Sequence, residues 1–148
     1  MALLDINAKD KIKNSQPFLK TSIVVCNLLI QNKINNLEYL KKFNGEYPYT
    51  ANLFNDKLLS KRLKNLLKDR FLFLKKNWAV ETPIEVRNNI FKAWGCKQHF
   101  CDSTNFIIVV DFKKNVIYVG IRENENVKVY SEDGSKNKFV EDWSKRIS

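Results

Sequence analysis

The densest cluster of reactive side chains in the sequence is Cys96-Lys97-Gln98-His99-Phe100-Cys101, which places two thiols around one imidazole. His99 is the single histidine of the chain, and Cys26 is its third cysteine. A thiol and an imidazole can act as nucleophile and base, but such pairs normally come from separate elements that converge in space. Residues two or three positions apart in one tight loop rarely align in that way, so the segment argues against cysteine catalysis.

The same segment could hold a metal ion, because thiolate and imidazole are ligands that zinc prefers. A closed zinc site needs four ligands, and the fourth would have to come from Asp102, Asp111 or Cys26. The second half of a usual zinc motif is missing from the sequence. We therefore predict no bound metal and no other cofactor, with zinc as the minor alternative.

A disulfide between Cys96 and Cys101 is the third alternative for this segment. Closing so short a loop stabilises the global fold less than closing a long one. Its larger effect would be local, since a fixed loop loses less ordering entropy when it binds a partner. The residues that it would present are Lys97, Gln98, His99 and Phe100.

Motifs of the common enzyme classes are missing, and the charge points to anionic partners. The sequence has no glycine-rich phosphate loop, no dinucleotide-binding glycine pattern and no His-Glu-x-x-His. Its formal net charge of +10 attracts nucleic acid, wall polymer or an acidic protein. A lysine stripe along one expected helix is either a solvated outer face, which is the simpler interpretation, or an anion-binding ridge. Its members are Lys57, Lys61, Lys64, Lys68 and Lys75.

The expected helices lie in the first half of the chain. Apolar residues three apart over residues 37–43 predict a short helix that Asn44-Gly45 ends. A longer helix is expected from a cap at Asn55 or Asp56 to about Asn77. Its apolar positions fall on one face at helical spacing; they are Leu59, Leu63, Leu66, Leu67, Phe71 and Leu74.

Strand patterns follow in the second half. Residues 84–86 and 90–94 predict two strands joined by Asn88-Asn89, a strong hairpin turn. Residues 106–110 form a continuous apolar run, which fits a central strand covered on both faces. Short connections predict antiparallel neighbours, with further strands over residues 116–121 and 127–130.

These elements predict a single α+β domain over residues 1–148. It consists of an antiparallel β-meander sheet packed against N-terminal helices, with a short C-terminal helix that contains Phe139, Val140 and Trp143. Residues 1–32 are expected to be a weakly ordered or peripheral segment. No apolar run reaches the length of a membrane span, and residues 1–16 lack the apolar core of a signal peptide.

The cysteine-flanked segment resembles the signature of the bacterial inhibitor of vertebrate lysozyme, the Ivy family. In that family a small residue precedes Cys-Lys-Pro-His-Asp-Cys, and a strand follows. The resemblance covers about residues 78–122. The matching features of this sequence are Gly95-Cys96-Lys97-Gln98-His99-Phe100-Cys101-Asp102-Ser103, the apolar strand at residues 107–110, and Thr82-Pro83 one hairpin earlier.

The resemblance implies a periplasmic inhibitor without catalytic activity. It implies that Cys96 and Cys101 form a disulfide, and that the enclosed loop inserts into the cleft of a lysozyme-like glycoside hydrolase. There His99 would contact the two catalytic carboxylates, to which an imidazole can donate hydrogen bonds. Gln98 stands where the family commonly has Pro, and Phe100 where it has Asp. A looser loop with an apolar contact in place of a polar one is therefore expected.

The leading hypothesis is a binding protein rather than an enzyme. Usual animal lysozymes are basic and would repel a +10 chain at long range, so a less basic bacterial wall hydrolase, bound in an immunity-like role, is the expected target. The alternative function is a basic anion-binding protein for nucleic acid or wall polymer. A disulfide predicts a periplasmic or secreted protein, whereas reduced thiols would indicate the cytoplasm.

Overall fold

The structure is a computed structural model that describes residues 20–146. The chain divides into two units, Met1–Asn36 and Leu37–Ser148. In the first unit, residues 20–34 form a helix. The single-domain organisation expected from the sequence stays a prediction. Of the expected peripheral segment 1–32, residues 1–19 lie outside the described part of the chain.

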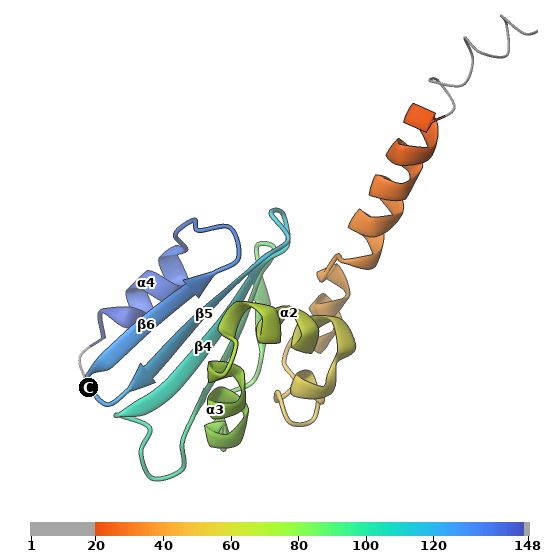
Figure 1. Cartoon of the computed structure of the whole chain (residues 1–148). Coiled ribbons are helices and arrows are strands. Elements are labelled where there is room, and N and C mark those ends of the chain that lie inside the picture. Colours follow the sequence, from red (N-terminus) through yellow and green to blue (C-terminus); the bar gives the residue numbers. More distant parts are fainter. Residues whose placement is uncertain (1–19, 147–148) are drawn as a thin grey trace, which may run out of the picture. The chain divides into compact units, whose positions relative to one another are not determined.

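The described part of the second unit contains six strands in one antiparallel sheet (Figure 1). The strand order is β1-β3-β4-β5-β6, and β2 pairs with residues 90–92 of β3. The predicted α+β class and meander are confirmed, while the two-residue β1 was not expected. The strands are β1 (Val80–Glu81), β2 (Glu85–Arg87), β3 (Ile90–Cys96), β4 (Thr104–Asp111), β5 (Val116–Glu123) and β6 (Asn126–Ser131).

The hairpin between β2 and β3 forms where the sequence predicts it. Asn88 and Asn89 both adopt positive φ angles, 51° and 61°. Two consecutive left-handed residues are the geometry of a type I′ turn, whose twist matches that of the flanking strands. Asparagine tolerates this conformation better than most residues, so local chemistry sets the register of the hairpin.

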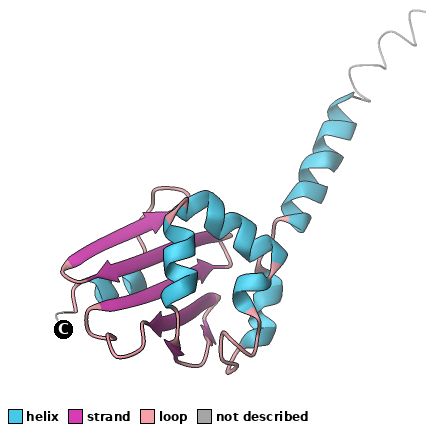
Figure 2. Cartoon of the chain, turned by 60° about the horizontal axis from the view of Figure 1, so that its bottom comes forward, coloured by secondary structure: helices cyan, strands magenta, loops and turns pink. Residues whose placement is uncertain are grey.

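The sheet is covered on both faces. Helices η1 (Glu38–Phe43), η2 (Leu53–Asn55), α2 (Lys57–Leu67) and α3 (Arg70–Asn77) cover one face, and α4 (Lys138–Ser144) covers the other (Figures 1 and 2). Alternate residues of β4 serve the two layers, because side chains point to opposite faces along a strand. Phe106, Ile108 and Val110 pack under α2 and α3, whereas Ile107 and Val109 pack under α4.

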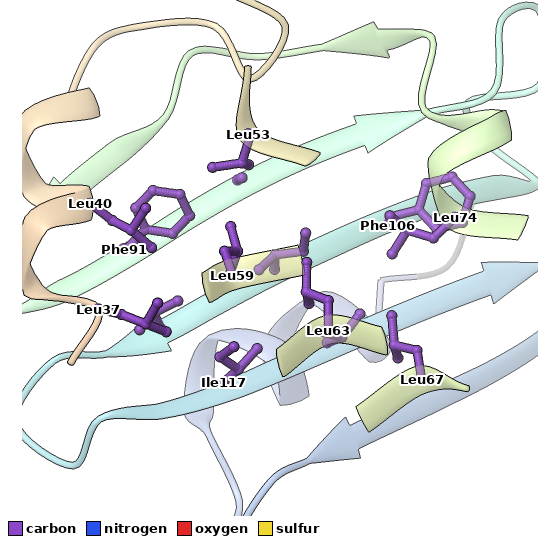
Figure 3. Packing of buried hydrophobic residues seen from close by; sticks show 14 of the residues in the cluster. Leu37, Leu40, Leu53, Leu59, Leu63, Leu67, Leu74, Phe91, Phe106 and Ile117 are labelled. Atoms are coloured by element: carbon purple, nitrogen blue, oxygen red, sulfur yellow. The ribbon is translucent and has the colours of Figure 1, made fainter. Parts of the chain in front are cut away.

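The larger core lies between the sheet and the N-terminal helices. Figure 3 shows Leu59 and Leu63 of α2 facing Ile117 of β5, with Leu40 beside Phe91 and Leu74 beside Phe106. These side chains are at most 2% exposed. The apolar face predicted for the helical residues between Leu59 and Leu74 is thus the face that packs on the sheet.

The predicted continuous helix from Asp56 to Asn77 is wrong. Asp56 does cap α2, since its side chain accepts a hydrogen bond of 2.9 Å from Leu59 N. The helix ends at Leu67, because Lys68 adopts a positive φ of 53° and redirects the chain into α3. The apolar spacing continues through the break because both helices pack on the same face of the sheet.

Within residues 20–146, no helix combines the length and the apolar character needed to cross a bilayer.

Candidate functional site

The cysteine-flanked segment lies at one end of the sheet, in the connection between β3 and β4. The final residue pair of that ladder is Cys96 opposite Asn105. A disulfide joins Cys96 to Cys101, with their Cα atoms 4.9 Å apart. We call residues 96–101 the disulfide loop. Cys96 is fully buried, whereas the four enclosed residues are all exposed, so the loop projects from a fixed base.

Trp78 fixes the strand that leads into the disulfide loop. A Cβ atom on Gly95 would lie 2.3 Å from Cε2 of this indole, so only glycine permits the observed packing. Trp78 also stacks on Phe106, the residue opposite Gly95, with ring centroids 5.9 Å apart. Its Nε1 donates to Glu81 at 2.9 Å. The base of the loop is therefore held by close packing before the disulfide is considered.

The tip of the disulfide loop is a tight turn with His99 in the left-handed region. Phe100 N donates to Lys97 O at 2.9 Å, which closes a four-residue turn. His99 has a φ of 67°, while Gln98 keeps a negative φ, and this pattern is that of a type II turn. Lys97 N donates to Thr104 O at 3.0 Å, and Thr104 N donates to Phe100 O at 2.7 Å. Backbone hydrogen bonds thus fix the position from which the imidazole projects.

The side chains of the tip face solvent. Phe100 is 53% exposed, and Lys97 Nζ lies 4.8 Å from the centroid of its ring, within the range of a cation–π contact. Among residues 20–146, the structure records no hydrogen bond or ion pair for the His99 side chain. The tip therefore offers an imidazole, an ammonium group and an apolar ring to a partner.

Asn105 connects the disulfide loop to α4. Its amide Nδ2 donates to Cys101 O at 2.7 Å, and its Oδ1 accepts from Trp143 Nε1 at 3.0 Å. Arg122 lies beside this pair and donates to the carbonyl oxygen of Trp143 at 3.3 Å, near the C-terminus of α4. A Cβ on Gly120 would lie 2.2 Å from Trp143, so the indole is closely fitted against β5. The far side of the loop thus rests on a buried hydrogen-bonded network.

A neighbouring turn supports the end of the connection. Asn124, in the turn between β5 and β6, donates its backbone N–H to Ser103 O at 2.7 Å. Ser103 N in turn donates to Phe100 O at 3.1 Å. The segment that returns the chain to β4 is therefore tied both to the tip and to the adjacent hairpin.

The predicted lysine stripe is divided between two helices, and most of it surrounds one hollow. Lys68 lies at the end of α2, outside the lining of this hollow. Lys75 of α3 donates to Asn55 Oδ1 at 3.3 Å, which holds it on the α2 side. The lining includes no carboxylate, so positive charge is concentrated here. It consists of Phe54, Asn55, Lys57, Ser60, Lys61, Lys64, Asn65 and Lys75.

The comparison with protein families agrees with this geometry. The family model described as inhibitor of vertebrate lysozyme (Ivy) matches residues 59–148, more than half of the chain. The chain belongs to the Ivy family. The match begins inside α2 and includes α3, the whole sheet, the disulfide loop and α4. It therefore extends beyond residues 78–122, over which the sequence alone shows the resemblance. Searches of curated proteins and of solved structures found no match.

Membership of Ivy makes this chain a relative of lysozyme inhibitors, whose function is to bind a protein. The disulfide engages both sulfurs of the loop, which leaves neither free as a nucleophile or as a thiolate ligand. Within the described part of the chain, no group of three or more His, Cys, Asp or Glu side chains could hold a metal ion. Of the three alternatives for the segment, the structure has the disulfide.

Sequence reasoning missed the residues that support the loop. Asn105 gave one weak signal, since it is an amide at the start of an otherwise apolar run. It is 8% exposed, and a buried amide needs hydrogen-bond partners. Its partner Trp143 and the guanidinium of Arg122 come from distant parts of the chain, so no local pattern could have joined them.

Proposed function

We propose that this Ivy-family protein inhibits a lysozyme-type glycoside hydrolase by inserting the disulfide loop into the catalytic cleft. The observation that carries the proposal is the exposed His99 at the tip of a turn fixed by a disulfide and by backbone hydrogen bonds. The imidazole donates to the paired carboxylates that such a cleft contains. Occupying that position excludes the substrate sugar without any reaction.

The rigidity of the loop supports this mode of binding. A partner that captures a flexible loop must offset the entropy lost on ordering it, and a preformed turn avoids most of that cost. Phe100 and Lys97 extend the contact beside the imidazole. Aromatic residues, phenylalanine among them, are enriched in protein interfaces. Phe100 therefore packs on an apolar wall of the target cleft.

The experiment is a cell-wall lysis assay with a panel of basic and acidic muramidases. The informative variants are His99→Asn and His99→Gly, because both residues tolerate the left-handed backbone that His99 adopts. Loss of the imidazole should weaken inhibition by about thirtyfold or more, the effect of losing a dominant contact of about 2 kcal/mol. Lys128→Ala, on the exposed face of β6, is the matched control and should inhibit like the wild type. Full inhibition by both His99 variants would contradict the proposal.

The disulfide also supports a location for this activity. Cytosolic thiols are normally kept reduced, whereas disulfides persist in the periplasm and outside the cell. We therefore place the protein in the periplasm or in the secreted fraction. Trapping of free thiols in intact cells tests this placement, since free Cys96 and Cys101 would oppose it.

A second candidate function is supported by the lysine-lined hollow beside α2. Four lysines around a hollow without a carboxylate suit an anionic polymer such as wall polymer or nucleic acid. The test is a titration with a defined oligonucleotide and with an anionic wall polymer at several salt concentrations. The double variant Lys61→Gln/Lys64→Gln should lower the salt dependence of the binding affinity. The control Lys113→Gln, on the β4–β5 turn, should leave it unchanged. Equal salt dependence in both variants would remove this candidate.

A further inference from the structure

The helix over residues 20–34 exposes many large apolar side chains. Their exposed fractions run from 49% for Val25 to 63% for Leu29. Burial of apolar surface is the main source of stability for a helix in water, and an isolated helix of this length is marginal. The helix therefore needs an apolar environment. The exposed residues are Ile23, Val24, Val25, Leu28, Leu29, Ile30 and Ile34.

The apolar side chains are distributed around most of the helix circumference. From Ile23 to Ile30, every residue except Asn27 is apolar, Cys26 included. Successive residues project about 100° apart, so these seven side chains point in nearly all directions. A helix that is apolar all round requires an environment that surrounds it. A single protein partner would cover one stripe and leave the remainder in water, whereas lipid covers every side.

The positive charge of residues 20–34 indicates which apolar environment the helix binds. Residues 20–34 contain Lys20 and Lys33 and no acidic residue. Three more lysines precede the helix in the sequence, against two aspartates: Lys9, Lys11 and Lys13 against Asp5 and Asp10. Basic residues beside an apolar helix are attracted to anionic lipid headgroups. The same lysines would repel each other if two copies of this helix associated.

We propose that residues 20–34 insert into the surface of an anionic bilayer and hold the protein there. The fifteen described helical residues extend about 22 Å, which is less than the roughly 30 Å of a hydrocarbon core, so within the described part of the chain this segment fits in one leaflet. This binding is independent of the proposed inhibition, and it would hold the whole protein at the membrane.

Cys26 provides the probe for the test. It is exposed on this helix, and the other two cysteines are joined in the disulfide. The full-length, oxidised protein is labelled at Cys26 with an environment-sensitive fluorophore and mixed with vesicles. Phosphatidylglycerol vesicles should shift the emission to shorter wavelength and increase its intensity, and pure phosphatidylcholine vesicles should have a much smaller effect. An unchanged spectrum with phosphatidylglycerol overturns the proposal.

Matched variants locate the binding surface. Leu28→Glu with Leu29→Glu should weaken vesicle binding at least about tenfold, because binding scales with the apolar area buried. Leu72→Glu alters a leucine of α3 that is 69% exposed, against 59% for Leu28 and 63% for Leu29, and should leave binding unchanged. A shift without vesicles that grows with protein concentration would identify a second copy as the occupant, which also overturns the proposal.

Discussion

The indole Nε1 of Trp143 donates a hydrogen bond of 3.0 Å to Oδ1 of Asn105. The two residues are 38 positions apart, and their contact joins α4 to the start of β4. Because the same amide also donates to Cys101 O, the position of the disulfide loop depends on the packing of the C-terminal helix. A contact distant from the exposed tip therefore contributes to the geometry of the candidate site.

The first prediction concerns this contact. Asn105→Leu leaves Trp143 Nε1 and Cys101 O without their partner and should lower the free energy of unfolding by about 1–3 kcal/mol. Trp143→Phe removes the donor, so the double variant should lose less stability than the sum of the single variants. Urea unfolding of the four proteins measures this coupling. Strict additivity would show that the hydrogen bond contributes nothing.

Local chemistry made the sheet predictable from the sequence. Asn88 and Asn89 favour the positive φ angles of the β2–β3 turn, and the continuous apolar run at residues 106–110 indicates a central strand that is covered on both faces. The break at Lys68 was not predictable in this way. Lysine has no preference for a positive φ, and the apolar spacing continues across the break because α2 and α3 cover the same core.

The candidate site was only partly predictable. The spacing of Cys96, His99 and Cys101 indicated the loop, since all three lie within six consecutive residues. The supports from Trp78 and Asn105 depend on tertiary contacts, which local patterns do not encode. The division of the lysine stripe follows from the unpredicted break between the helices.

The second prediction separates the local and global effects of the disulfide. Replacing Cys96 and Cys101 with serine should cost about 2 kcal/mol in the free energy of unfolding, since the closed loop is short. The loss in the free energy of binding to the target hydrolase should exceed the loss in the free energy of unfolding, because an open loop must be ordered on binding. Parallel measurement of urea unfolding and inhibition under oxidising conditions tests both effects. A serine variant that inhibits as well as the wild type would show that the disulfide does not organise the loop.

The third prediction concerns Tyr39, whose hydroxyl donates to Asp56, the cap of α2. Burial raises the pKa of Tyr39 above its usual range, and the hydrogen bond to Asp56 and the charge of Asp56 raise it further. The folded state therefore holds this proton more tightly than the unfolded state. The stability that the protonated Tyr39 hydroxyl contributes is complete below the unfolded-state pKa of about 10 and is lost as pH rises above that value. The stability difference between wild type and Tyr39→Phe should shrink above about pH 10. A difference that stays constant on titration to higher pH would contradict this assignment.

The fourth prediction tests the turn at the tip of the disulfide loop. Gln98 occupies the second position of a type II turn, where proline has the required φ, and the structure records no hydrogen bond from the Gln98 backbone N–H within residues 20–146. Gln98→Pro should raise the free energy of unfolding by about 0.4–1 kcal/mol, because it restricts the unfolded chain. It should also tighten inhibition, since less entropy remains to be lost in the complex. His99→Pro is the opposing control, because proline cannot adopt a φ of 67° and should distort the tip. If Gln98→Pro weakened both stability and inhibition, the turn at this position would not be type II.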